Sequence, residues 1–177
     1  VLSKRLRFPL IVKSLFFEAS TGISQASVVE NEEQFARRVQ FVHDSLGTAA
    51  IVEQFIDGRE MYVGVLGSDR LRGFPVWEMS FAKMPENTWH IATERVKWST
   101  KYQEKHGIDT GEAALTYGAA SRVQHLAKRV FRALDLTGYA RVDLRMAADG
   151  RLFVIEANPN PQLAQGEDFA QSAKLAK

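Results

Sequence analysis

Near the end of the chain, apolar and polar residues alternate along two runs that flank Asp149-Gly150. An Asp-Gly pair between such runs is the strongest short-range signal for a two-residue hairpin turn. Residues at equal distances from that turn lie opposite each other, so the pattern places Asp143 across from Glu156 and Arg141 across from Asn158. The other face of the hairpin is predicted to belong to the core and carries Val142, Leu144, Met146, Phe153, Ile155 and Ala157.

The polar face of this hairpin would bring two carboxylates together. Asp143 and Glu156, directly opposite on neighbouring strands, repel each other, and a hairpin that only needed stability would avoid them. A divalent cation such as Mg²⁺ relieves the repulsion, because it binds carboxylates together with substrate phosphates. Asn158 adds a neutral oxygen, and Arg141 can meet an anion. The residues alone leave a second interpretation open, a solvated face on which Arg141 and Arg145 neutralise the acids.

Three segments are predicted to be helices. The first begins at Asn31, which forms a capping-box pattern with Gln34, and ends at Gly47. The second covers 112–138, where apolar residues recur at helical intervals. The third covers 168–177, with its first residue as the N-cap.

The remaining apolar runs predict strands, so the chain is expected to have an α+β fold. A short run that ends at Lys13 is the first strand, and 49–56, 59–66 and 71–76 are three more. Residues 79–112 show little periodicity and are predicted to form a long loop. Such loops are usually functional or mobile.

The composition is that of a folded chain with one ordinary domain or two small subdomains. Of its 177 residues, 45% are hydrophobic and 25% charged, and the net charge of +2 gives no reason to expect a nucleic-acid partner. The chain has no cysteine, which excludes disulfides and zinc–thiolate sites and fits the cytoplasmic location that we expect. No apolar run approaches the ~20 residues that span a bilayer, so no membrane partner is expected. Because it starts at Val1 rather than at Met, we expect a piece of a longer protein.

A small polar loop follows the first strand. Lys13 ends the strand, and Ser20, Thr21 and Gly22 lie a few residues later. Glycine lets a backbone approach a phosphate, hydroxyl and N–H groups donate to it, and lysine supplies a positive charge. The loop is not a Walker motif, and a lysine beside an ordinary turn is the alternative.

Further charged residues lie at positions where a nucleotide could use them. Glu53 and Glu60 flank an Asp-Gly pair, and their carboxylates can accept from ribose hydroxyls or an adenine amine. Lys97 and Lys101 lie in the predicted long loop. Exposed acids and solvated lysines are the alternative interpretation of all four.

The order of these weak signals carries more information than any one of them. The chain resembles the ATP-grasp superfamily, specifically its D-alanine–D-alanine ligase-like branch. The segments that carry the resemblance occur in the family's order: Phe-Pro-Leu-Ile-Val-Lys (8–13), Ala-Ser-Thr-Gly-Ile-Ser (19–24), Val-Glu-Gln-Phe-Ile-Asp-Gly-Arg-Glu (52–60), Lys-Tyr (101–102), Gly-Tyr-Ala-Arg-Val-Asp (138–143) and Val-Ile-Glu-Ala-Asn-Pro-Asn-Pro (154–161).

The resemblance implies a fold and a role for each candidate. It implies two α+β subdomains, 1–56 and 57–177, with the nucleotide site between them, and makes 52–60 a crossing between subdomains instead of a hairpin. For ATP it implies phosphate contacts from Lys13, Ser20, Thr21, Gly22 and Lys101, base contacts from Glu53 and the backbone at Phe55 and Ile56, and a ribose contact from Glu60. For two Mg²⁺ ions, with Mn²⁺ as a substitute, it implies Asp143, Glu156 and Asn158. Arg141 and Lys101 would be catalytic, with Arg141 stabilising an acylphosphate.

The implied activity is that of an ATP-dependent carboxylate–amine ligase with an acylphosphate intermediate. Its partners would be ATP, small carboxylate and amine substrates, and an N-terminal domain of the same protein, without which the chain is expected to be inactive. The ligases have a Gly- and Ser-containing run after the metal-binding asparagine, whereas here 159–164 reads Pro-Asn-Pro-Gln-Leu-Ala. The alternatives are therefore another ATP-grasp ligase, acting on a peptide or protein C-terminus or a carboxylated metabolite, and a non-catalytic nucleotide-binding regulatory domain.

Overall fold

A computed structural model describes residues 6–176, which form two compact units. The first unit comprises the described residues up to Ile56 together with Phe81–Ile108, and the second comprises Asp57–Ser80 and the residues from Asp109 onward. The sequence had assigned 81–108 to the second unit. These residues belong to the first because Ile91 packs in one apolar cluster with Val28 and Phe55.

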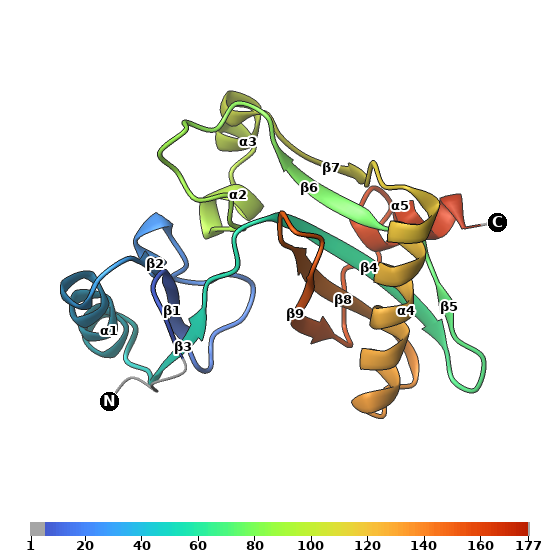
Figure 1. Ribbon diagram of the computed structural model, residues 1–177, viewed down its shortest axis with the longest axis horizontal. Helices are drawn as coiled ribbons and strands as arrows, with labels where there is room; N and C mark the ends of the chain where they lie inside the picture. Colours follow the sequence, from blue (N-terminus) through green and yellow to red (C-terminus); the bar gives the residue numbers. More distant parts are fainter. Residues whose placement is uncertain (1–5, 177) are drawn as a thin grey trace. The chain divides into compact units, whose positions relative to one another are not determined.

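The first unit is a small antiparallel sheet with a helix packed on it (Figure 1). Its strands are β1 (Leu10–Ser14), β2 (Val28–Val29) and β3 (Ala50–Gln54), in the order β2-β1-β3. A short 3₁₀ helix, η1 (Gln25–Ser27), precedes β2, and α1 (Glu32–Leu46) follows it. Side chains of β1, β2 and α1 form the core: Leu10, Val12, Val29 and Val42.

Helix α1 begins and ends where the sequence predicts. The side chain of Asn31 accepts a hydrogen bond from the Gln34 amide at 2.9 Å, and Gly47 ends the helix in the left-handed conformation with φ of 64°. The first helix is therefore confirmed together with both of its capping residues.

The predicted long loop contains regular structure, so that prediction is wrong. The first unit carries α2 (Glu94–Trp98) and α3 (Thr100–His106) there. Thr93 and Ser99 cap the two helices with their hydroxyls. Each helix is only one or two turns long, and so short a segment shows no hydrophobic period that could be recognised.

The second unit is built on an antiparallel sheet with the order β7-β6-β4-β8-β9. The central strands are β4 (Arg59–Gly67), β8 (Gly138–Met146) and β9 (Leu152–Asn158). The outer strands are β6 (Trp77–Phe81) and β7 (Ile108–Glu112), and the short β5 (Arg72–Gly73) pairs with β4. Because β3 and β4 belong to different sheets, the connection between them is a crossing, as the resemblance implies, and not a hairpin.

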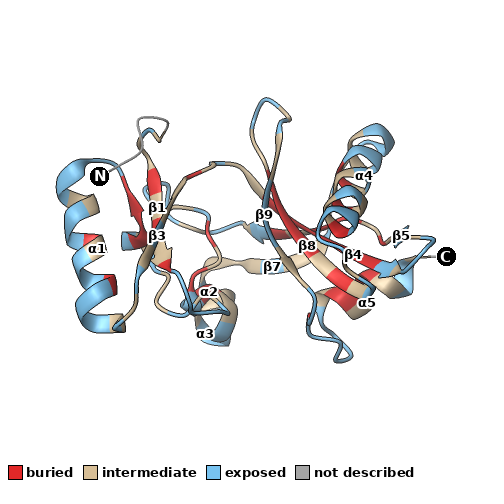
Figure 2. Ribbon diagram, turned by 90° about the horizontal axis from the view of Figure 1, so that it is seen from below, coloured by how far each residue is buried: buried red, intermediate tan, exposed pale blue. Residues whose placement is uncertain are grey.

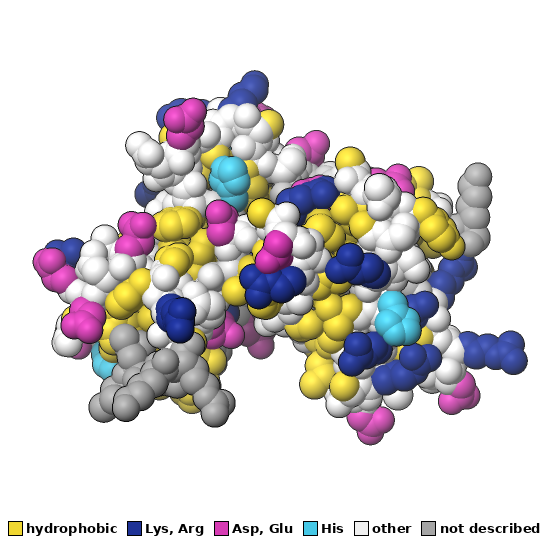
Figure 3. Space-filling model, viewed as in Figure 1, with side chains coloured by type: hydrophobic (Ala, Val, Ile, Leu, Met, Phe, Trp, Pro, Cys, Tyr) yellow, Lys and Arg dark blue, Asp and Glu magenta, His cyan; other side chains and the backbone are white. Residues whose placement is uncertain are grey.

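Two helices pack on this sheet. Helix α4 (Tyr117–Ala133) begins after the N-cap Thr116, not at Glu112 as predicted. The N-cap of α5 (Asp168–Leu175) is Glu167, not Asp168 as predicted. In Figure 2 buried residues follow β4, β8 and the inner side of α4, and they include Met61, Val63, Val65, Val123, Ala127, Phe131, Val142 and Leu144. Lys and Arg side chains gather over the outer side of α4 in Figure 3. Across residues 6–176, no helix has the length and apolar character of a membrane span.

The β8–β9 hairpin reaches the predicted pairing by another route. The Ala147 amide donates to the Arg151 carbonyl and the Gly150 amide donates to the Ala147 carbonyl, so three residues, 148–150, form the loop instead of two. Gly150 has φ of 79°, which glycine adopts at little cost. A register shift next to Asp143 then leaves Ile155 without a partner on β8.

The longer loop and the bulge offset each other, so Asp143 pairs with Glu156 and Arg141 with Asn158, as predicted. The prediction of which β9 residues face the core is partly wrong. Phe153 pairs with Arg145 on the polar side, and Ile155 is 38% exposed, whereas Leu152 and Ala157 pack against the core.

Candidate functional site

The polar face of the second unit is made of three neighbouring strands in register. Glu60 and Tyr62 of β4 lie beside Arg145 and Asp143 of β8, respectively. On the other side of β8, Asp143 lies beside Glu156 of β9. The alternation of strand side chains places these residues on one face and the apolar residues under α4 on the other. This face therefore collects most of the acids that the sequence singled out.

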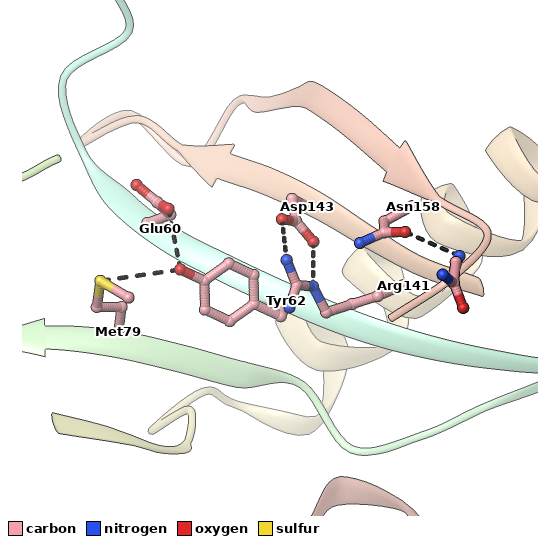
Figure 4. A network of polar contacts seen from close by, with 7 residues as sticks. Glu60, Tyr62, Met79, Arg141, Asp143 and Asn158 are labelled. Atoms are coloured by element: carbon pink, nitrogen blue, oxygen red, sulfur yellow. Dashed lines mark hydrogen bonds and ion pairs between the residues drawn. The ribbon is translucent and has the colours of Figure 1, made fainter. Parts of the chain in front are cut away.

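Arg141 and Asp143 form a two-pronged ion pair on this face (Figure 4). The Nε and Nη2 atoms of Arg141 donate to the two carboxylate oxygens of Asp143, both at 2.7 Å. Burial raises the pKa of Asp143 to about 7; the guanidinium of Arg141 opposes this shift and the carboxylate of Glu156 adds to it. Without a metal, the arginine thus supplies the positive charge that this buried acid needs.

Glu60 lies in a second buried network on the same face. Its Oε2 accepts from Arg145 at 2.8 Å, and its Oε1 accepts from the Tyr62 hydroxyl at 2.9 Å. Burial, together with the charge of Glu60, raises the pKa of Tyr62 well above its ordinary value, so the hydroxyl stays protonated and donates. Each oxygen of Glu60 keeps lone-pair capacity for a further donor such as a ribose hydroxyl.

Glu156 and Asn158 complete the oxygen-rich edge of the hairpin. Glu156 is exposed, and the side-chain oxygen of Asn158 accepts from the Asn160 amide at 2.8 Å. Two carboxylates and an amide oxygen suit a hard cation such as Mg²⁺. Within the described part of the chain, no group of three or more His, Cys, Asp or Glu residues is placed to hold a metal ion.

In the first unit, Lys13 and Glu53 form an ion pair between the neighbouring strands β1 and β3. Their side chains are 23% and 42% exposed, respectively, so both remain accessible to a ligand. The Phe55 side chain is buried against Trp89, and its amide donates to the Pro9 carbonyl at 3.2 Å. That donor is therefore already engaged within the protein.

The polar loop of the first unit has an unusual backbone. Ala19 and Ser20 have φ of 54° and 64°, a region that non-glycine residues rarely adopt, and Gly22 has φ of 72°. Strain of this kind tends to collect at ligand-binding loops. Thr21 and Ile23 donate backbone hydrogen bonds to Glu18 and Ser20, which close the loop on itself.

Helix α2 contacts this loop, and this is a feature that the sequence did not reveal. The Trp98 indole donates to the Ala19 carbonyl at 3.3 Å, and the Glu94 amide donates to the Ile23 carbonyl at 3.2 Å. Lys97 lies on the same helix, whereas Lys101 lies in α3 and is exposed. Both lysines thus stay candidates for a phosphate, and the contacts of α2 favour Lys97.

Comparison with solved structures defines the fold. The chain is similar to the VanG D-Ala:D-Ser ligase from Enterococcus faecalis, with a TM-score of 0.72 and 22% identity over 96% of this chain and 46% of that one. It is also similar to D-alanine–D-alanine ligase from Bacillus anthracis complexed with ATP, with a TM-score of 0.68 and 21% identity over 96% and 47% of the two chains. The fold is the ATP-grasp fold, which confirms the predicted fold class.

Sequence comparison then defines the family. The family model described as the D-ala D-ala ligase C-terminus matches residues 1–176, and the chain belongs to this family. A D-alanine–D-alanine ligase from Desulfotalea psychrophila is 32% identical over 172 residues, which are 97% of this chain and 50% of that protein. The chain thus spans about half the length of the curated relatives that it matches. The resemblance inferred from the sequence segments is confirmed.

Proposed function

We propose that this chain is the ATP-binding half of a ligase that joins a carboxylate to an amine through an acylphosphate. The observation that carries the proposal is the paired acids Asp143 and Glu156 on the β8–β9 hairpin, with Asn158 beside them, in a chain of this family. Relatives of similar sequence are named D-alanine–D-alanine ligases, and one solved neighbour is complexed with ATP.

The residues of the first unit would act on the base and the phosphates. Lys13, Ser20, Thr21 and the Gly22 backbone would bind the phosphates, with Lys97 or Lys101 as a second cation. Glu53, together with the backbone at Phe55 and Ile56, would hold the adenine. Such contacts position the γ-phosphate and neutralise its charge, which is most of what phosphoryl transfer requires of a protein.

The residues of the second unit would hold the ribose, the metal and the intermediate. Glu60 would accept from the ribose hydroxyls. Asp143, Glu156 and Asn158 would bind Mg²⁺, two ions being expected and Mn²⁺ being able to replace it, and the metal would neutralise charge on the phosphates. Arg141, released from Asp143, would donate to the acylphosphate as a two-pronged partner.

A second candidate concerns the acceptor. Residues 159–164, Pro-Asn-Pro-Gln-Leu-Ala, lack the glycine and serine expected for binding a second D-amino acid. This observation favours a ligase of the same class with another amine acceptor, or one that acts on a peptide C-terminus or a carboxylated metabolite. Its test is a screen of amine and carboxylate substrates for phosphate release by the full-length protein.

Calorimetric titration with a non-hydrolysable ATP analogue tests the proposal for the chain itself. Binding should be saturable and should require Mg²⁺, while hydrolysis of ATP by the chain alone stays at the background rate. A folded chain that gives no binding signal up to millimolar analogue would refute the nucleotide site, and with it the alternative of a non-catalytic nucleotide-binding domain.

A further inference from the structure

Gly22, at the end of the polar loop, is held from two sides by charged side chains of the first unit. Arg38 of α1 donates from Nη2 to the Gly22 carbonyl at 2.5 Å. The amide of Gly22 donates to Oε2 of Glu94 at 3.4 Å. In the proposed phosphate loop, the Gly22 carbonyl is thus bound by a cation and the Gly22 amide by an anion.

Arg38 is a buried cation that has no carboxylate partner in the part of the chain that the structure describes. Its exposed fraction is 7%, and no carboxylate of the described residues lies within ion-pair distance. Besides Gly22, its guanidinium donates to the Ser27 hydroxyl at 2.7 Å and lies 4.6 Å from the centre of the Phe41 ring. Its Nε is buried with no hydrogen-bond partner.

Such a residue is costly to the fold. A buried charge is normally paired, and a buried N–H without an acceptor adds a desolvation penalty. Burial lowers the pKa of Arg38, as expected for a cation without a compensating anion. The arginine still remains charged at neutral pH. An anion bound at the neighbouring loop would supply the missing negative charge.

Glu94 is a negative charge at the loop, where Arg38 is a positive one. Its side chain is exposed, and its carboxylate accepts from the Gly22 amide, a donor that a phosphate oxygen would use in the same way. A carboxylate and a phosphate compete for one N–H group and repel each other. The 3.4 Å separation marks a weak hydrogen bond, so the carboxylate can be displaced.

From these contacts we propose that Arg38 and Glu94 are positioning residues of the nucleotide site. Arg38 holds the Gly22 carbonyl so that the loop keeps the conformation that receives the phosphates. Glu94 occupies the Gly22 amide until the phosphates displace it. The inference rests on the proposed function, because it assigns the loop's ligand as the phosphates of a nucleotide.

The test for Arg38 compares a ligand with phosphates and one without. In Arg38→Met, the dissociation constant of the Mg²⁺–ATP analogue should rise about tenfold, while that of adenosine stays within about twofold of wild type. Arg38→Lys keeps the charge and one donor, so it should restore part of the lost affinity. If Arg38→Met does not fold, the same selective loss, smaller in size, is expected of Arg38→Lys and decides the question.

The neighbouring arginine is a matched control. Arg37 precedes Arg38 on α1, but it is exposed and pairs with Glu33 at 2.9 Å on the surface. Arg37→Met should leave both dissociation constants unchanged. Equal losses of analogue and adenosine affinity in the Arg38 variants, or losses no larger than in Arg37→Met, would overturn the role of Arg38.

Substitution of Glu94 should change the affinity for the ATP analogue in the opposite direction. Glu94→Gln keeps the side-chain shape and removes the competing charge, so the analogue should bind about threefold more tightly, with adenosine unchanged. Glu104→Gln, at an exposed acid of α3, is the control. An unchanged or weaker analogue affinity in Glu94→Gln would overturn the displacement idea. If the wild-type chain binds no analogue, the proposed function fails; if it binds and these variants behave like their controls, this inference alone fails.

Discussion

In the second unit each buried acid of the site has an arginine partner, whereas the buried Arg38 of the first unit has no acid partner among residues 6–176. Asp143 pairs with Arg141 and Glu60 with Arg145, and the two acids are 4% and 8% exposed. The two buried acids are therefore neutralised without a ligand. Arg38, which donates to the Gly22 carbonyl of the polar loop, is a buried positive charge with no ion pair among the described residues.

Under the proposed function, the phosphates of the nucleotide and the metal would each compensate charge in one of the two units. Phosphates would compensate the cations at the loop of the first unit. A metal ion would replace arginine as the partner of Asp143 and release Arg141 for the intermediate. Each unit thus holds charges that a bound ligand would compensate better.

The largest expected effect comes from breaking the buried pair of the second unit. Asp143→Asn leaves Arg141, whose side chain is 18% exposed, without its charged partner, which should cost about 3 kcal/mol of unfolding free energy. The variant should also lose Mg²⁺-dependent binding of the ATP analogue. Denaturant melts and calorimetry measure the two effects.

Asp149 offers a control with the same spacing. It pairs with Arg151 two residues later, but the side chains are 52% and 72% exposed. Asp149→Asn should change stability by less than about 0.5 kcal/mol. Similar stability losses in both variants would show that the ion pair of Asp143 contributes no more to stability than an exposed pair does.

The next effect separates the two lysines of the first unit. Lys97→Ala should weaken binding of the ATP analogue about tenfold, because α2 contacts the polar loop, whereas Lys101→Ala should change it less than twofold. The assay is the same titration at fixed Mg²⁺. A larger loss of analogue affinity in Lys101→Ala would show that Lys101, as the sequence resemblance implies, contacts the phosphates.

A smaller effect concerns local protection. Amides of 19–24 and of 94–98 should exchange about threefold to tenfold more slowly when the ATP analogue is bound, because the ligand stabilises a loop that must open for exchange. Amides of β4 should be unaffected. Hydrogen exchange followed by mass spectrometry measures this, and equal protection with and without the analogue would contradict a loop that closes on the nucleotide.

The smallest effect is expected at Glu156. Glu156→Gln removes the repulsion toward Asp143, and because Glu156 is exposed the gain in stability should be only about 0.3 kcal/mol. Glu112→Gln, at an exposed acid of β7, should show no gain. A clear loss of stability in Glu156→Gln would mean that Glu156 has a structural partner, and would argue against its role as a metal ligand.

The sequence predicted the fold best where local signals agreed. Asn31 and Gly47 marked the ends of α1, and the pairing of Asp143 with Glu156 was correct. That pairing was predicted from a two-residue turn, and it survived only because the bulge at Ile155 offsets a three-residue loop. Bulges depend on tertiary packing and are not visible in an alternating pattern.

The site was predicted less completely, for two physical reasons. Helices α2 and α3 are too short to show a period, so their contacts with the polar loop were invisible. Arg38 was overlooked although a signal existed. It lies three residues after Phe35 and four before Val42, which is the apolar side of α1, whereas Arg37 lies off that side.

The most direct test of the account is to locate the metal. Mn²⁺ can replace Mg²⁺ and broadens the NMR signals of nearby nuclei, so it can be added in small amounts to isotope-labelled chain with the ATP analogue bound. The amide signals around Asp143 on β8 and around Glu156 and Asn158 on β9 should broaden first, and Asp143→Asn should abolish the effect. Broadening that begins elsewhere, or that persists in Asp143→Asn, would contradict the central claim that this hairpin binds the metal of a nucleotide.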